Sequence, residues 1–588
     1  MLATSFFLLR SASQRLESYD SHSGTSVSSE CIARLCRQVR KILFHLSRPL
    51  RSTIYKNKPI WAQRSSLAET ATVFNVPRGT AYITIQQIVI YATALVYYVL
   101  LVRVLNLSQI GEISLLTAAL VIFTTLSQLA LPAAATRFIS ASMGTQNPTH
   151  AAAVARTSLR LLLAIAGPAL ILAILASPLI GMTIFNASNP WALIVTFAGS
   201  FLLDITTLFG AYFLGLGRYA DLAYQNILFY PLSRGLGLAL ASTSLGVLGI
   251  PIGWAVGAFA TLILSLYLWT GKLPHPNSFP ARRLLVFSLP LFASTIVTLL
   301  QNWGDIALLQ AILGTFSTTG AYYLVVSSIS FLSILWTPVA GALYPSLSSS
   351  YTSEGPSAVS AKLGVATRLV NLTVLPAGVS LAAVAPTALE AVFGASLANQ
   401  AVPFAILAVT IIFSAQSLLL ITTLQSVSRT AHILGISLAA TLVDLVTVSL
   451  GASFLGTTVG AIGRALLAAT MLWLAWVSLR RIIHAPLASG LSKGLTLTLL
   501  TALPLLAVDQ ILTATFHVLP LPRLTLLLVT FVVCFLIAAR TFSVFNEDDF
   551  KLLENALPIF SRRYMMILKR LLVRTGTTRP QRKEPEIR

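Results

Sequence analysis

Residues 401–424 have the sequence AVPFAILAVTIIFSAQSLLLITTL, which contains no Asp, Glu, Lys or Arg. About 20 apolar residues in an α-helix, each rising about 1.5 Å, cross the hydrocarbon core of a bilayer, which is about 30 Å thick. Lipid offers the backbone no hydrogen-bond partners, so such a stretch must be helical to satisfy its own amide and carbonyl groups. We therefore predict a transmembrane helix over residues 401–424.

Comparable apolar stretches recur along most of the chain between Gly79 and Ala539. Only 10% of the 588 residues are charged, whereas soluble domains average about 25%. The sequence therefore predicts an all-α membrane protein of about 14 transmembrane helices. The remaining spans are expected at residues 79–102, 113–134, 157–180, 190–215, 222–242, 246–269, 284–311, 319–343, 363–385, 430–451, 457–479, 494–514 and 522–540.

The basic residues are distributed unevenly, and this predicts the orientation of the chain. Of the 40 Lys and Arg residues, 23 lie in the flanks, before Thr80 or after Ala539. With the N-terminus inside, only Arg103 and Arg523 fall in outer loops. Because inner loops are enriched in Lys and Arg, we expect both termini on the cytoplasmic side of the cell membrane. The short inner loops then carry 13 basic residues, namely Arg137, Arg156, Arg160, Arg218, Lys272, Arg282, Arg283, Lys362, Arg368, Arg429, Arg480, Arg481 and Lys493.

The net charge of +22 would suggest a nucleic-acid partner if the protein were soluble. Here most of the charge lies in basic flanks beside a hydrophobic body, as is typical of segments that face anionic lipid headgroups. We therefore expect membrane lipids, and no nucleic acid, as partners.

A faint internal repeat suggests how the spans are grouped. Leu107-Ser-Gln-Ile-Gly111 opens the second span, and Phe316-Ser-Thr-Thr-Gly320 precedes the eighth span 209 residues later. Two six-helix halves and two extra helices would explain this spacing. The expected organisation is then a basic, polar extension at 1–77, partly disordered or amphipathic, halves at 78–283 and 284–483, two helices within 484–540, and a basic amphipathic cytoplasmic tail at 541–588.

No motif for chemistry or energy conversion is found. The sequence contains no G-x-x-x-x-G-K-[ST] loop, and no soluble domain is large enough to hold one. No His, Cys or acidic cluster has metal-ligand spacing, and no convincing catalytic pair lies within the spans. We therefore predict a protein that is not an enzyme and that has no cofactor or metal. The two overlapping G-x-x-x-G units at Gly249, Gly253 and Gly257 are expected to be a helix-packing surface.

Five ionisable residues lie within predicted spans, where burying a charge is costly and usually functional. The acids are Asp204, Asp305 and Asp444, and the bases are Arg234 and Arg464. A planar guanidinium binds two phosphate oxygens at once, whereas a carboxylate can take up H⁺ or Na⁺ or balance an Arg. The alternative is that these acids and bases pair across helices and serve only to hold the bundle together.

One span carries polar residues beside its acid. Gln301 and Asn302 lie just before Asp305 in the seventh span. Such side chains would be wasted against lipid, so this part of the helix is expected to face a cavity or another helix.

Several stretches occur in an order typical of one transporter family. They are Arg78-Gly79, Arg103-Val-Leu-Asn-Leu-Ser-Gln-Ile-Gly111, Asp305-Ile-Ala-Leu-Leu-Gln-Ala-Ile-Leu-Gly314 with Gly320-Ala-Tyr-Tyr and Leu343-Tyr-Pro-Ser-Leu-Ser-Ser, and Asp548-Asp-Phe-Lys-Leu-Leu-Glu-Asn-Ala-Leu-Pro558. Together they resemble the oligosaccharide-lipid flippases, the Wzx-like polysaccharide exporters of the multidrug/oligosaccharidyl-lipid/polysaccharide transporter superfamily. The tail is similar to that of archaeal members. The resemblance covers roughly residues 78–560.

The resemblance implies two six-helix bundles in a V shape, followed by two further helices. It implies a flippase that moves a lipid-linked oligosaccharide, of the polyprenyl- or dolichyl-phosphate type, from the cytoplasmic to the outer leaflet by alternating access. The family's cavity is often cationic, which fits Arg234 and Arg464 as phosphate ligands. We place Arg78, Gln301 and Asn302 in the same headgroup site. Coupling to H⁺ or Na⁺, or charge balance, is assigned to Asp204, Asp305 and Asp444.

Other functions are compatible with part of the sequence. An ion-coupled multidrug or cation antiporter of the same superfamily would favour an acidic, aromatic cavity over arginines. A flippase for a peptidoglycan-precursor-type lipid is a further alternative. A membrane glycosyltransferase would need a catalytic carboxylate and usually a large outer loop, and the predicted outer loops are short. A structural scaffold would leave its buried charges paired.

Overall fold

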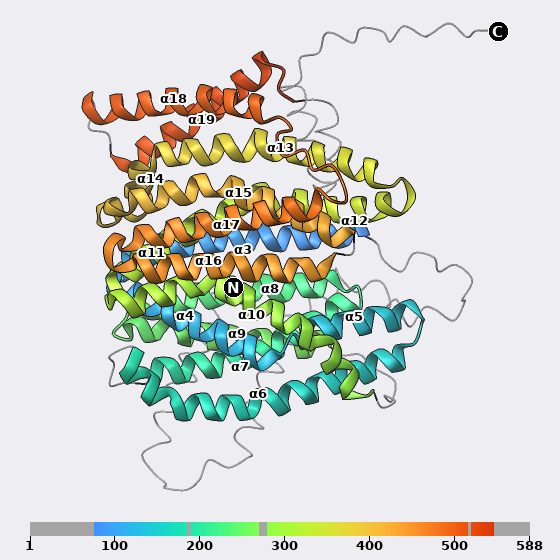
Figure 1. Cartoon of the computed structure of the whole chain (residues 1–588). Helices are drawn as coiled ribbons and strands as arrows, with labels where there is room; N and C mark the ends of the chain where they lie inside the picture. Colours follow the sequence, from blue (N-terminus) through green and yellow to red (C-terminus); the bar gives the residue numbers. More distant parts are fainter. Residues whose placement is uncertain (1–75, 185–189, 270–278, 428, 516–518, 546–588) are drawn as a thin grey trace, which may run out of the picture. The chain divides into compact units, whose positions relative to one another are not determined.

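The computed structural model describes residues 76–184, 190–269, 279–427, 429–515 and 519–545. All of them belong to one compact unit, Phe74–Arg588. They form helices and no strand, and most of the helices run parallel or antiparallel to one another (Figure 1). The α-helices are α3 (Val76–Val104), α4 (Leu107–Gln128), α5 (Leu131–Gly144), α6 (Pro148–Ile184), α7 (Trp191–Gly215), α8 (Tyr219–Ala241), α9 (Gly249–Leu268), α10 (Ala281–Leu313), α11 (Phe316–Ser330), α12 (Thr337–Ser353), α13 (Pro356–Ala383), α14 (Ala385–Phe393), α15 (Ala401–Ser426), α16 (Thr430–Leu455), α17 (Thr457–Leu479), α18 (Leu491–Thr515) and α19 (Pro520–Thr541).

The all-α, multi-span architecture predicted from hydropathy is confirmed. Among the described residues, 13 helices are long and apolar enough to cross a membrane. The fourteenth expected span is α8, which is a helix of 23 residues but is too polar to be counted among the 13. It packs against α3 and α9 inside the bundle. The extension at 1–75 and the amphipathic tail after residue 545 lie outside the described residues.

Two predicted spans have ends that differ from the structure. The span expected at 113–134 is α4, which ends at Gln128, because Leu129 and Ala130 adopt left-handed φ values of 46° and 56°. The span expected at 319–343 is interrupted by a 3₁₀ turn, Phe331–Leu335, before α12 begins. In both places a proline in the first turn, Pro132 or Pro338, starts the next helix, because proline fixes φ near the helical value.

The internal repeat extends well beyond the two five-residue segments. Helices α4, α5, α6 and α9 each have a counterpart that begins 206–209 residues later, and the paired starts are Leu107 and Phe316, Leu131 and Thr337, Pro148 and Pro356, and Gly249 and Thr457. The two repeat segments also touch each other. A Cβ on Gly111 would overlap the carbonyl of Phe316, and a Cβ on Gly320 would overlap the carbonyl of Leu107 and lie 2.6 Å from Gly111 N. The halves therefore meet through equivalent residues at the ends where α4 and α11 begin.

The glycines of α9 form the predicted packing surface. A Cβ on Gly253 would lie 2.5 Å from Gly237 Cα, and one on Gly257 would lie 2.6 Å from Ser233 Cβ. Only hydrogen fits at these positions, so the backbones of α8 and α9 approach closely. This seam holds the polar helix α8 in place.

The last two helices are attached by a polar clamp. In α18, Asp509 accepts a hydrogen bond from Thr387 in α14 at 2.9 Å and pairs with Arg523 in α19 at 2.7 Å. The Asp509 and Arg523 side chains are only 13% and 12% exposed. The clamp therefore ties α14, α18 and α19 together at one end.

Candidate functional site

Arg234 is a cation without an acidic partner in the interior of the first half. Its guanidinium donates to the backbone carbonyl of Ile90 in α3 at 3.2 Å. It also lies 5.1 Å from the ring centroid of Tyr230 and 5.7 Å from that of Tyr97, which are cation–π distances. No carboxylate of the described chain pairs with it. The positive charge of Arg234 is thus held by dipoles and ring faces and not neutralised.

Arg464 is held very differently, in a buried ion pair. Its Nε and Nη2 donate to the two carboxylate oxygens of Asp305 at 2.6 Å and 2.9 Å. The Tyr322 hydroxyl donates to the same carboxylate at 2.7 Å. The Asp305 side chain is fully buried, and that of Arg464 is 18% exposed. This bidentate pair joins α10 to α17, and Gly460 of α17 makes room for the Tyr322 ring.

Asp444 lies beside this pair but outside it. The carboxyl group is fully buried on α16, and neither of its oxygens has a hydrogen-bond partner in the described chain. One oxygen occupies the space where a Cβ on Gly463, the residue before Arg464, would project. A buried carboxyl group without a partner is costly when ionised, so this is a site where a proton or a cation would be stabilising.

An aromatic cluster links the two halves between Arg234 and the Asp305–Arg464 pair. Tyr97 contacts Tyr98 in α3, and the Tyr98 hydroxyl meets the hydroxyl of Tyr323 in α11 at 3.0 Å. Tyr323 in turn stacks on Trp303 of α10 at 6.0 Å. None of these four aromatic residues was predicted to bind a ligand, because an aromatic residue in an apolar helix carries no distinguishing pattern.

Asp204 anchors a separate polar network in the first half. Its carboxylate accepts hydrogen bonds from the Ser127 hydroxyl and, at 2.8 Å, from the Gln128 amide of α4. The same amide donates to Thr207 at 2.8 Å. Asp204 is therefore fully buried but hydrogen-bonded.

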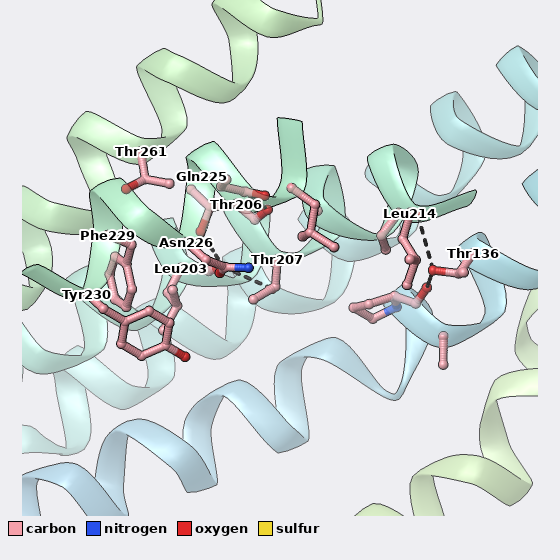
Figure 2. A pocket seen from close by; sticks show the side chains of 15 residues that line it. Thr136, Leu203, Thr206, Thr207, Leu214, Gln225, Asn226, Phe229, Tyr230 and Thr261 are labelled. Carbon is pink, nitrogen blue, oxygen red and sulfur yellow. Dashed lines mark hydrogen bonds between the residues drawn. The ribbon is translucent and has the colours of Figure 1, made fainter. Parts of the chain in front are cut away.

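A cavity of about 420 Å³ lies next to this network, between α5, α7, α8 and α9. Its polar side chains include Thr206, Thr207, Gln225 and Asn226. Figure 2 shows these four in the middle of the cavity, with Phe229 and Tyr230 to one side and Thr136 to the other. Two adjacent polar amides near the start of the span predicted at 222–242, Gln225 and Asn226, would have been the sequence signal for this cavity.

The remaining predicted site residues do not gather around one ligand. Gln301 donates to the carbonyl of Ser437 at 3.2 Å, which is a contact between α10 and α16. The exposed Asn302 donates from its side chain to its own helix, and its carbonyl accepts from Arg464 at 2.9 Å. Arg78 lies in the first turn of α3, and its side chain is outside the described residues.

The arrangement can bind an anion at one place and exchange a cation at others. Arg234 supplies an uncompensated positive charge, whereas Arg464 is already neutralised by Asp305. Asp204 and Asp444 are the buried carboxyl groups outside that pair. This division between the two arginines is not visible in the sequence.

Comparison with solved structures defines the class of fold. The structure resembles one titled "Lipid II flippase MurJ, inward closed conformation", with a TM-score of 0.62 and 12% identity over 78% of this chain and 98% of that chain. It also resembles the inward-facing conformation of a multidrug resistance MATE family transporter of the MOP superfamily, with a TM-score of 0.53 and 15% identity over 69% of this chain and 93% of that chain. The fold is therefore that of membrane flippases and transporters.

Part of the sequence matches a known family. The family described as "Polysaccharide biosynthesis protein" matches residues 76–351, which run from the start of α3 into α12. This match and the shared fold confirm the predicted resemblance to the polysaccharide exporters of the superfamily. No curated protein matches significantly, and the archaeal membership suggested by the tail stays a prediction.

Proposed function

We propose that the protein is a flippase that moves a lipid-linked oligosaccharide from the cytoplasmic to the outer leaflet of the plasma membrane, with both termini cytoplasmic. The lipid is of the polyprenyl- or dolichyl-phosphate type, and the product serves polysaccharide or glycoprotein assembly. Support comes from the match to polysaccharide biosynthesis proteins over residues 76–351, from the flippase fold and from the basic inner loops.

The unpaired charge of Arg234 is the observation that supports a substrate with a phosphate group. An uncompensated guanidinium inside a membrane bundle is costly, and a phosphate group is the ligand that its planar donors fit best. Tyr97 and Tyr230 flank it with ring faces. A phosphate that entered here would replace weak dipolar contacts with two charge-assisted hydrogen bonds.

The contact between Gly111 and Gly320 supports alternating access. It joins the two halves through equivalent positions at the ends where α4 and α11 begin, which the basic inner loops assign to the outer side. In this conformation the outer side is therefore closed. Separation of α4 from α11 would open it, with a proton or sodium ion exchanging at Asp204 or Asp444 as the proposed coupling step.

An ion-coupled multidrug antiporter is the second candidate, and the likeness to a multidrug transporter favours it. A cationic drug would need a free carboxylate that it can reach. Asp305 is fully engaged by Arg464 and Tyr322, and Asp444, which has no partner in the described chain, is fully buried. Arg234 would also repel the drug. A flippase for a peptidoglycan-type lipid shares the phosphate chemistry and differs in the sugar.

Transport in liposomes tests the proposal. The purified full-length chain is reconstituted with a polyprenyl phosphate that carries a fluorescent oligosaccharide, and membrane-impermeant dithionite reports how fast the label changes leaflet. We expect the wild type to accelerate exchange and Arg234→Ala to slow it about tenfold or more, because a hydrogen bond to a charged group contributes about 1.5–3 kcal/mol. Arg234→Lys should restore part of the rate, since it keeps the charge without the planar donors.

The matched control is Arg103→Ala, which removes an exposed arginine at the end of α3 and should leave the rate unchanged. A wild type no faster than protein-free liposomes would reject the flippase. Full activity of Arg234→Ala would reject the role of Arg234. Uptake of ethidium driven by a proton or sodium gradient would favour the antiporter instead.

A further inference from the structure

The cavity between α5, α7, α8 and α9 is mostly apolar, carries a few polar side chains and is uncharged. None of the 15 described residues that line it is Asp, Glu, Lys, Arg or His. Its volume of about 420 Å³ falls within the range of about 300–1,000 Å³ that is usual for small-molecule sites. A phosphate or a cationic drug would find no opposite charge here, so the lining favours a neutral ligand with hydroxyl groups.

Gln225 shows that the cavity holds an unused hydrogen-bonding group. Its side chain is 4% exposed, and its amide nitrogen donates to the carbonyl of Thr206 at 2.5 Å. Its oxygen Oε1 is buried and has no partner in the described chain. A buried acceptor left without a donor costs roughly 1–3 kcal/mol, and a hydroxyl from a ligand would remove that cost.

The neighbouring groups suit a sugar ring. The hydroxyl of the exposed Thr207 donates to carbonyls of its own helix and accepts from the Gln128 amide, which leaves one lone pair to accept from a sugar hydroxyl. The rings of Phe229 and Tyr230 lie at one side of the cavity, where Figure 2 shows them next to the polar cluster. An apolar ring face beside a few placed polar groups is the usual composition of a small-molecule site.

The cavity and Arg234 are adjacent along one helix. Asn226, Tyr230 and Arg234 are spaced four residues apart on α8, so they lie on one face of the helix. The Arg234 guanidinium lies over the ring of Tyr230, and Tyr230 itself lines the cavity. A phosphate at Arg234 would therefore place the group bonded to it within reach of Asn226.

We propose that this cavity binds the first neutral sugar, a hexose or N-acetylhexosamine, of a glycan whose lipid phosphate is held by Arg234. The proposal rests on the proposed flippase function and adds a site that distinguishes glycosylated from bare lipid. Gln225 Oε1 accepts a sugar hydroxyl, Thr207 and Asn226 bond others, and Tyr230 covers the ring.

Binding of matched lipids tests this site. The full-length chain in nanodiscs is titrated with a polyprenyl phosphate without sugar and with the same lipid carrying glucose, galactose, mannose or N-acetylglucosamine. At least one glycosylated lipid should bind about tenfold more tightly than the bare lipid, a difference of about 1.4 kcal/mol. Gln225→Met and Thr207→Val should each reduce that advantage severalfold and leave the affinity for the bare lipid unchanged. Thr207→Val replaces a small, exposed side chain and also removes the acceptor of one Gln128 hydrogen bond; it serves as the test if Gln225→Met does not fold.

Thr261→Val is the control within the same cavity, because Thr261 is only 1% exposed, unlike Thr207, and its hydroxyl donates to the carbonyl of Gly257 at 2.7 Å. It should preserve the advantage. Equal affinity for all five lipids, or equal weakening of bare and glycosylated lipids by Gln225→Met and Thr207→Val, would overturn the sugar site while the phosphate site stands. Failure of the wild type to bind any of the five would instead overturn the flippase proposal.

Discussion

Replacing Gly320 with alanine should shift the protein away from the conformation described here. The new Cβ would lie 2.6 Å from Gly111 N and nearer still to the carbonyl of Leu107. Ordinary contacts between such atoms are about 3.5–4.0 Å, so α4 and α11 must separate by roughly an ångström. Overpacking of this kind costs about 1–3 kcal/mol. Because about 1.4 kcal/mol is a factor of ten, the closed state should lose tenfold or more in population relative to any state in which the helices are apart.

Spin labels at Ser108 and Ser317 would measure this shift. Both residues are exposed beside the contact, and the three natural cysteines would first be replaced by serine. We expect Gly320→Ala and Gly111→Ala to lengthen the distance between the labels in the same way, because the two positions are equivalent in the repeat. Gly341→Ala is the control, since a Cβ there meets nothing within 4 Å. An unchanged distance distribution for Gly320→Ala would refute the contact as a gate.

Three further predictions concern buried charges and use thermal unfolding in detergent or hydrogen exchange. Arg464→Ala should lower the free energy of unfolding by about 3–5 kcal/mol, because it leaves Asp305 buried without its ion-pair partner. Changing both residues to neutral ones should recover much of this loss. A double variant no more stable than Arg464→Ala would contradict a stabilising ion pair. Asp444→Asn should not lower stability, because the Asp444 oxygens have no hydrogen-bond partner among the described residues, and a loss as large as that of Arg464→Ala would count against this. Arg523→Gln should speed hydrogen exchange in α18 and α19 by loosening the clamp at Asp509, and unchanged exchange would show that packing alone holds these helices.

Hydropathy was sufficient to predict where the chain is helical, but it could not predict where the helices break. Lipid imposes helical hydrogen bonding on any long apolar stretch, so 401–424 and its counterparts were found from composition alone. The break between α11 and α12 lies inside such a stretch, at Phe331–Leu335. Hydropathy does not mark this break, although Pro338 in the first turn of α12 fixes where the following helix starts.

The sequence predicted which residues belong to the candidate site, but not which of them pair with one another. The cost of intramembrane charge singled out Arg234, Arg464 and Asp305. Which arginine is neutralised depends on the approach of α10 and α17, whose paired residues are 159 positions apart. Gln225 and Asn226 were missed because neutral amides were considered only beside an acid within a span, as Gln301 and Asn302 are beside Asp305.

The polarity of α8 has a consequence for the biogenesis of the protein. A helix that carries Arg234 as well as Gln225 and Asn226 is a poor substrate for lateral release from the translocon, where one central Arg costs about 2.5–3.5 kcal/mol. The glycine seam offers a partner as soon as α9 has been synthesised. We therefore expect α8 and α9 to enter the bilayer together as a hairpin, so that bulky substitutions at Gly253 would cause topological errors during synthesis and degradation by quality control.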